Sequence, residues 1–76
     1  MGTMRIIDRT GDTVIDWRPD DPTSVEEAEA IFERLRRERQ MPFGRAAGAP
    51  AKDAVLLRSF DPTLEEIVWV RPVQGG

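Results

Sequence analysis

The residues of this chain best suited to chemistry are the two glycines that close it, Gly75 and Gly76. They follow an apolar run at residues 67–70 after only four intervening residues. Glycine at a free end stabilises no element, because it has no side chain and the most conformational entropy to lose. Either this ending is accidental, or something outside the domain requires a bare backbone at this position. If the chain reacts, its terminal carboxylate is the group best placed to do so.

The rest of the chain offers little chemistry of its own. It contains no cysteine and no histidine, which excludes thiol nucleophiles, thiolate metal sites, disulfides and imidazole catalysis within the chain. Asp8, Asp12 and Asp16 recur at four-residue intervals, a spacing that suggests a cation site. Across two predicted strands and a turn, their oxygens do not converge as those of a calcium loop do. We expect these aspartates to solvate a hairpin, and we expect no enzymatic activity.

A basic cluster places four arginines within six residues: Arg34, Arg36, Arg37 and Arg39. It is either a docking patch for an acidic partner or a nucleic acid, or a solvated helix end that complements the helix dipole. Glu33 and Glu38 interrupt the cluster, and we favour the second interpretation. The net charge of −3 argues against general nucleic-acid binding, which needs cations to displace counterions from phosphate.

The composition is that of one small globular domain. The chain has 76 residues, of which 39% are hydrophobic and 33% charged, so it must fold around a single thin core. No apolar run approaches the roughly 20 residues needed to span a bilayer. The first residues predict a strand rather than a signal peptide, so we expect a cytoplasmic protein with no membrane contact.

Two strands and a helix are predicted in the first half. Short β-branched segments at residues 4–8 and 13–17 flank turn residues at 9–12, which indicates a hairpin with Trp17 in the core. Residues 4–7 leave open whether Met4 and Ile6 or Ile7 face inward. A helix begins at Thr23 or Ser24, because each is followed by a glutamate at the capping-box spacing. Its apolar stripe comprises Val25, Ala28, Ile31, Phe32 and Leu35.

The second half predicts three more strands. Residues 41–45 suit an edge strand, where Pro42 is tolerated, and a loop without regular structure follows at 46–53. Residues 54–58 form the next strand, and residues 60–66 a short helical turn. The last strand, at residues 67–71, is expected in the sheet centre, parallel to the first. The fold class is therefore α+β, with one helix across one face of a mixed sheet.

This element order resembles the ubiquitin-like β-grasp family over residues 4–76. The sharpest similarity is the closing stretch from Thr63, which runs through the last strand to the diglycine. The resemblance implies a β-grasp domain at residues 1–70, with a mixed sheet of four to five strands packed on one main helix. It also implies an extended tail at residues 71–76. Pro72 and a single lysine, Lys52, distinguish the chain from ubiquitin itself and suggest a distant bacterial member.

The resemblance also implies a function. In the family, an activating enzyme uses ATP to adenylate the C-terminal glycine, here Gly76, which is then joined to an amine of a target protein. The chain would bind no cofactor itself and would be a monomer, with a conjugating enzyme and a processing protease as further partners. The tail residues that the activating enzyme would recognise are Arg71, Pro72, Val73 and Gln74. Lys52 is a candidate acceptor for a second copy.

Two alternatives remain open, as does a surface role for the last strand. The first alternative is a sulfur carrier similar to those of molybdopterin or thiamine synthesis, in which the C-terminal glycine would carry a thiocarboxylate. The second alternative is a β-grasp interaction module, an adaptor that keeps the fold but is not conjugated. If Ile67 and Trp69 face the helix, then Val68 and Val70 face outward, and they form either a partner patch or plain sheet surface.

Overall fold

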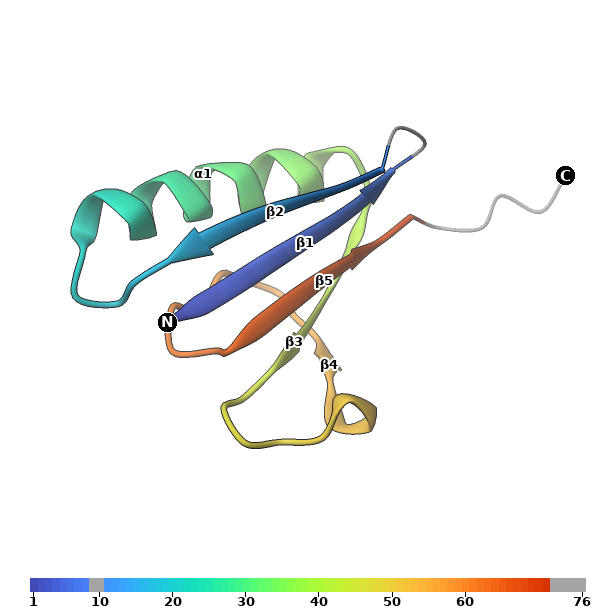
Figure 1. Ribbon diagram of the computed structural model, residues 1–76. Coiled ribbons are helices and arrows are strands. Elements are labelled where there is room, and N and C mark those ends of the chain that lie inside the picture. The colour runs from blue at the N-terminus through green and yellow to red at the C-terminus, as the bar shows by residue number, and fades with distance from the viewer. Residues whose placement is uncertain (9–10, 72–76) are drawn as a thin grey trace, which may run out of the picture.

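The computed structural model describes residues 1–8 and 11–71 and contains one α-helix packed against a five-stranded mixed sheet (Figure 1). The elements are β1 (Gly2–Asp8), β2 (Gly11–Trp17), α1 (Pro22–Arg37), β3 (Met41–Arg45), the 3-10 helix η1 (Ala51–Asp53), β4 (Val55–Leu56) and β5 (Glu66–Val70). This arrangement confirms the predicted α+β class and is β-grasp-like. No helix in the described ranges has the length and apolar character needed to cross a bilayer.

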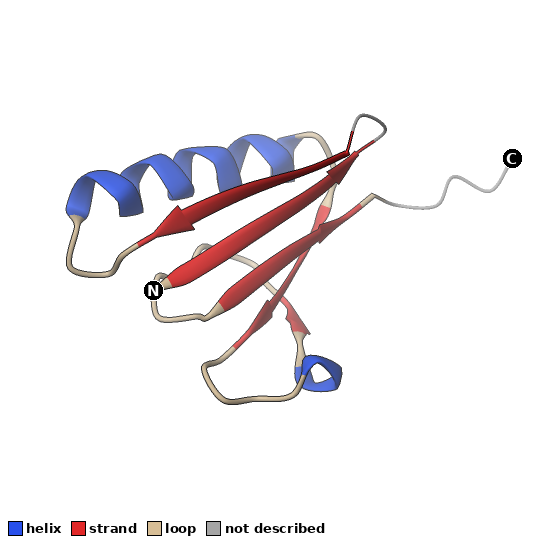
Figure 2. Ribbon diagram, in the orientation of Figure 1, coloured by secondary structure: helices blue, strands red, loops and turns tan. Residues whose placement is uncertain are grey.

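The first and last strands pair in the middle of the sheet. The strand order is β2-β1-β5-β3-β4, with β1 and β5 parallel and every other neighbouring pair antiparallel. Met4 lies beside Ile67 and Ile6 beside Trp69. The predicted central position of the last strand is confirmed. Figure 2 shows α1 on one face of the sheet, and the opposite face is here called the outer face.

The core lies between α1 and the inner face of the sheet. Met4 and Ile6 are buried while Ile7 is 51% exposed, which answers the question that the sequence left open in the first strand. The buried residues of the helix are Ala28, Phe32 and Leu35, all from the predicted stripe. Four aromatic rings meet edge to face in the order Trp17, Phe60, Phe32 and Trp69, with centroids 5.0 to 5.8 Å apart. Such pairs stabilise a small core beyond the area they bury.

Trp17 is fully buried and held from two sides. Its indole Nε1–H donates a hydrogen bond to the Pro62 carbonyl, 2.9 Å away. The ring also covers Gly2, its partner in the β1–β2 register, so closely that a Cβ on Gly2 would lie 2.1 Å from Cζ2 of the indole. The close approach of the two strands at this point therefore requires glycine. Trp69 is equally buried, but its Nε1 has no hydrogen-bond partner among the described residues.

The N-cap of the helix lies two residues before Thr23 and three before Ser24, the caps that the capping-box pattern predicts. Asp21 is the N-cap, and its carboxylate accepts hydrogen bonds from the backbone N–H groups of Thr23 and Ser24. Pro22 takes the first helical position, where its missing N–H costs nothing. The hydroxyl of Ser24 instead bonds the preceding loop, accepting from the Arg18 N–H at 2.9 Å. The expected cap at Thr23 or Ser24 is therefore wrong.

The helix ends in a left-handed residue that is not glycine. The Gln40 N–H donates to the Leu35 carbonyl and the Arg39 N–H to the Arg36 carbonyl, which is the bonding pattern of a Schellman motif. Arg39 has φ 65°, in the position that glycine usually occupies because a Cβ there costs about 1–2 kcal/mol. The chain therefore keeps an arginine where glycine would fit with less strain.

Two predicted elements of the second half are corrected. β3 is not an edge strand but lies between β5 and β4. Pro42 is tolerated there because β4 pairs only with Phe43 and Gly44, and the Pro42 carbonyl still accepts a hydrogen bond from the Leu57 N–H at 2.9 Å. The edge strand on this side of the sheet is β4, with two residues instead of the five predicted.

The short helical turn expected at residues 60–66 is not formed. The Glu65 N–H donates to the Arg45 carbonyl, and the Glu65 carbonyl accepts from the Thr3 N–H. Both backbone groups of Glu65 are thus hydrogen-bonded to neighbouring strands, so they cannot form the hydrogen bonds of a helix. The short helical element is η1, within the segment that the sequence predicts to lack regular structure.

Candidate functional site

The outer face of the sheet carries a band of uncovered apolar side chains. Because side chains alternate along a strand, the residues next to the buried positions point outward. The apolar side chains on this face are Ile7, Val14, Met41, Phe43, Leu56, Val68 and Val70. Val70 is 41% and Leu56 56% exposed. Exposed apolar side chains that gather on one face of a protein are typical of a binding site.

The band contains a hollow of about 210 Å³. Phe43, Val68 and Val70 line it from the sheet, and Ala51 and Ala54 line it from η1 and the residue after it. The register explains the first group, because Phe43 is paired with Val68 across β3 and β5. The hollow is small for a cofactor or drug-sized ligand, whose pockets are usually about 300–1,000 Å³. It is suited to one or two apolar side chains of a protein partner.

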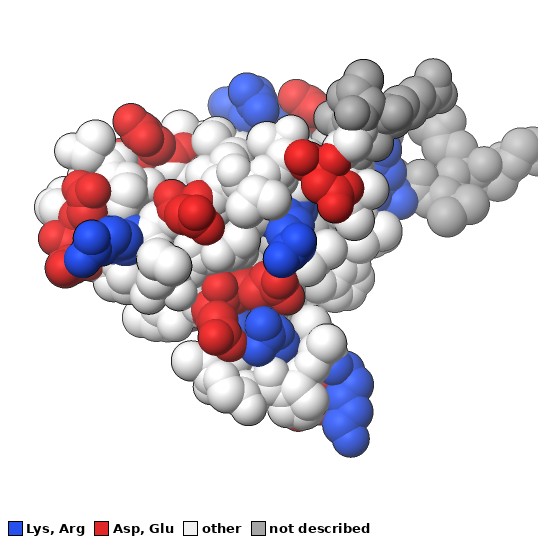
Figure 3. Space-filling model, in the orientation of Figure 1, with Lys and Arg blue, Asp and Glu red and all other residues white. Residues whose placement is uncertain are grey.

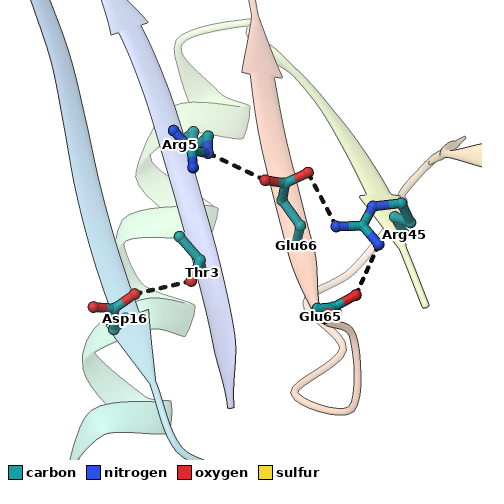
Figure 4. A network of polar contacts seen from close by, with 6 residues as sticks. All are labelled: Thr3, Arg5, Asp16, Arg45, Glu65 and Glu66. Carbon is teal, nitrogen blue, oxygen red and sulfur yellow. Dashed lines mark hydrogen bonds and ion pairs between the residues drawn. The ribbon is translucent and has the colours of Figure 1, made fainter. Parts of the chain in front are cut away.

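A polar network borders the hollow (Figure 4). The Glu66 carboxylate accepts from Arg5 Nε at 3.1 Å and lies 3.5 Å from Arg45 Nη2. Arg45 Nη1 donates to Glu65 Oε2 at 2.7 Å and to the Ala49 carbonyl at 2.9 Å. Arg45 is only 20% exposed at its side chain, so its position is well defined. Through Ala49 it holds the segment that carries η1 against the sheet.

The charges of this region balance one another. In the orientation of Figure 1, acidic and basic side chains lie side by side and do not form a surface of one sign (Figure 3). Beside the network, the Thr3 hydroxyl donates to Asp16 Oδ1 at 2.9 Å. Paired charges at the margin of an apolar patch are typical of a protein–protein interface, where the rim is polar and the centre apolar.

Side chains that could ligate a metal ion do not gather among the described residues. No group of three acidic side chains among them is placed to hold a metal ion. Asp12 and Asp16 lie in β2, and the side chain of Asp8 lies outside what the structure describes. Asp61 has a pKa below its ordinary value of 3.8, because the side chain and backbone N–H of Thr63 both donate to its carboxylate. It sits in the turn before β5 and does not line the hollow.

The residues predicted to be functional are brought together only in part. Val68 and Val70 point outward as expected, and both line the hollow. Lys52 lies exposed in η1, next to the lining residue Ala51. Arg71 is exposed directly after β5. The predicted site residues Pro72, Val73, Gln74, Gly75 and Gly76 lie outside the residues that the structure describes.

Sequence reasoning missed the residues that complete the hollow. Phe43 and Arg45 were assigned to an edge strand, and their contact with β5 was not foreseen. A signal was present in the alternation of large residues with small ones, since Pro42 and Gly44 separate Met41, Phe43 and Arg45. Gly44 faces inward, where a Cβ would come within 2.7 Å of the side chains of Leu57 and Leu64. The small residues therefore mark the buried face and the large ones the open face.

The hollow, its charged rim and the position of β5 are the structural features that bear on function. The hollow gives a surface for an apolar partner, its paired charges give a defined rim, and β5 links both to the segment that follows Val70. A comparison of the chain with models of protein families, with curated proteins and with solved structures finds no match.

Proposed function

We propose that this protein is a ubiquitin-like modifier, adenylated at Gly76 by an activating enzyme and then joined to an amine of a target protein. The observation that carries the proposal is the position of β5. It is a central strand of a β-grasp-like sheet, and the sequence from Arg71 to Gly76 follows it directly. Hydrogen bonds to strands on both sides hold β5 in place. The residues that follow β5 in the sequence are therefore attached to a fixed part of the domain.

The proposed chemistry needs only a carboxylate from this chain. An oxygen of the Gly76 carboxylate attacks the α-phosphorus of ATP, and pyrophosphate leaves. A thiolate of the partner enzyme then attacks the acyl carbon and AMP leaves, and the target amine displaces the thiolate to form an amide. ATP is bound by the activating enzyme. Gly75 and Gly76 allow the close approach of backbone and channel wall that this reaction requires.

The hollow on the outer face provides the second contact with partners. An aliphatic side chain of the activating or conjugating enzyme inserts between Val68, Val70 and Phe43, while residues 71–74 contact the same enzyme. Lys52, the single lysine of the sequence, is the acceptor if chains form. The modifier acts as a cytoplasmic monomer, and a protease exposes Gly76 if the chain is made with an extension.

Intact-mass measurement tests the proposal directly. The purified chain is incubated with ATP and, in turn, with each adenylating enzyme of its source organism. The expected product is an ATP-dependent adduct at Gly76 that disappears when Gly75 and Gly76 are deleted. Exchange of one oxygen for sulfur would instead identify a sulfur carrier, and full biological activity of the deletion variant would identify an adaptor. The absence of any ATP-dependent product from all of these enzymes would refute the proposal.

A matched pair of valines tests the role of the hollow. Val70→Ser alters the hollow, whereas Val14→Ser alters a valine of β2 that is also on the outer face but outside it. The two side chains are 41% and 51% exposed, so both substitutions should change the free energy of unfolding by a similar, small amount. Val70→Ser is expected to raise the KM for the activating enzyme about fivefold, as loss of about 1 kcal/mol of contact predicts. Equal effects of the two variants on KM would contradict this role.

A further inference from the structure

The basic end of α1 is a second feature that the proposed function does not use. Within the last turn and the connection to β3 lie Arg34, Arg36, Arg37 and Arg39. Arg36 has a structural role, because its guanidinium donates to the Arg58 carbonyl. Arg34 makes only a long ion pair with Glu38, 3.9 Å between Nε and Oε2. Arg37 and Arg39 are exposed, and their side chains have no hydrogen-bond or ion-pair partner among the residues described.

The helix dipole does not account for all of these charges. A cation in the last turn is stabilised by the free carbonyls there, which explains Arg34, Arg36 and Arg37. Arg39 lies beyond the helix with φ 65°, where glycine would relieve the backbone strain. Strained backbone conformations cluster at binding and active sites, so the conformation of Arg39 points to a role for its side chain. For Arg39, that side chain offers a fixed positive charge with a planar set of donors.

The position of Arg39 places this charge near the end of β5. Met41, the first residue of β3, is paired with Val70, the last residue of β5. Because β3 and β5 are antiparallel, Arg39 precedes the pair on one strand and Arg71 follows it on the other. Figure 1 shows the connection from α1 to β3 and the end of β5 at the same end of the sheet. Arg39 is thus close to the end of β5.

We infer that Arg37 and Arg39, with Arg34 and Arg71, form a basic docking surface for acidic side chains of the enzyme that acts at Gly76. This inference rests on the proposed function and names the chemistry of its partner. Carboxylates match the guanidinium groups in charge and in bidentate geometry. Nucleic acid is the less suitable partner, because the chain as a whole is acidic, with net charge −3, and Glu33 and Glu38 interrupt the cluster.

Arg39 provides a sharp test, because charge and strain can be separated there. Arg39→Gly removes both, and Arg39→Lys removes neither. Arg18→Gln is the control, since Arg18 precedes α1 and forms an exposed ion pair with Asp20 at the opposite end of the helix. Arg39→Gly should raise the melting temperature, so any loss of binding in this variant does not come from unfolding. A purely structural role for Arg39 predicts the opposite change in stability and no change in binding.

The first measurement uses an acidic peptide and needs no enzyme. The 15N-labelled full chain is titrated with a peptide of glutamate residues, and amide shifts are expected at residues 34–41 and at Arg71. Arg39→Gly should raise the Kd for the peptide about fivefold. Arg39→Lys and Arg18→Gln should leave the Kd within about twofold of the wild-type value. Unchanged binding by Arg39→Gly, or an equal loss with Arg18→Gln, would overturn the inference. Tighter binding of a single-stranded oligouridylate to the same residues would overturn the choice of partner.

The second measurement follows adenylation of the same variants. Arg39→Gly is expected to raise KM about fivefold with kcat unchanged, because the surface contributes to association and not to the chemical step. If an enzyme adenylates the wild-type chain and the KM for Arg39→Gly is unchanged, the inference is overturned and the proposed function remains intact. If no enzyme adenylates the wild type, the proposed function fails, and the assignment of this partner fails with it. The peptide titration still decides whether the surface selects acidic chains.

Discussion

The contact between Gly2 and Trp17 gives the most quantitative prediction about this fold. An alanine at position 2 would place its Cβ 2.1 Å from Cζ2 and 2.2 Å from Cε2 of the indole. Both distances are well below 3.0 Å, the shortest contact that Cβ atoms normally make with other heavy atoms. Neither side moves easily. Gly2 is fixed by its pairing with Trp17 in the β1–β2 ladder, and the indole is fully buried and bonded to the Pro62 carbonyl.

The expected cost of Gly2→Ala has two parts. Overpacking of a core by one methyl group costs about 1–3 kcal/mol. If the indole shifts to make room, its hydrogen bond to Pro62 is lost, which adds about 1 kcal/mol. The free energy of unfolding should therefore fall by about 2–4 kcal/mol. For a domain of this size each kcal/mol corresponds to about 4–8 °C, so the melting temperature should fall by roughly 10–30 °C.

A double-mutant cycle separates the clash from other effects of the substitution. Gly2→Ala is measured by urea denaturation in the wild type and in Trp17→Phe, which lacks the indole atoms that approach position 2. In the Trp17→Phe background the cost of the alanine should fall below about 1 kcal/mol, because the clashing ring is absent. The same cost in both backgrounds would refute the steric explanation, as would a cost under about 0.5 kcal/mol in the wild type.

Three further substitutions test individual contacts. Trp17→Phe should destabilise the fold by about 1 kcal/mol more than Trp69→Phe, because only the first removes an indole hydrogen bond; parallel urea titrations check this, and equal costs would contradict it. Asp21→Ala should cost about 1 kcal/mol through loss of the helix cap, measured as a lower denaturation midpoint, whereas a change within error would mean that the cap contributes nothing. Thr63→Val should raise the pKa of Asp61 towards 3.8, because the hydroxyl donor is lost. Since the folded pKa of Asp61 is depressed, its contribution is present above the unfolded pKa and is lost as the pH falls through the folded value. The variant should thus lose stability at neutral pH and match the wild type at the acid end, and carboxyl NMR titration together with denaturation at several pH values checks both.

Features that depend on local pattern were predicted well. The stripe that ends in Phe32 and Leu35 identified the buried face of α1. Apolar residues on both faces of the run at 67–70 indicated a central strand, and the alternation along that run set Trp69 apart from its neighbours. Each of these patterns is set by residues close in sequence and does not depend on contacts with distant segments. The outward direction of Val68 followed from the same alternation.

Features that depend on contacts between distant segments were predicted poorly. Residues 60–66 suit a helical turn by composition, yet Glu65 is bonded to two strands that lie far from it in sequence. The cap at Asp21 was missed because two hydroxyls fit the local motif, and the choice was made by the contact of Ser24 with Arg18. The hollow needs the β3–β5 register, which no local pattern contains.

The pairing of β1 with β5 has a consequence for the order of folding. It joins Thr3 to Glu66, almost the whole length of the chain, and closing so long a loop makes folding slow. During synthesis the β1–β2 hairpin and the helix are complete long before β5 emerges, and until then β1 and β3 lack the strand that connects them. The hollow contains Val68 and Val70 of that same strand. A nascent chain therefore completes its fold and the hollow in one late step.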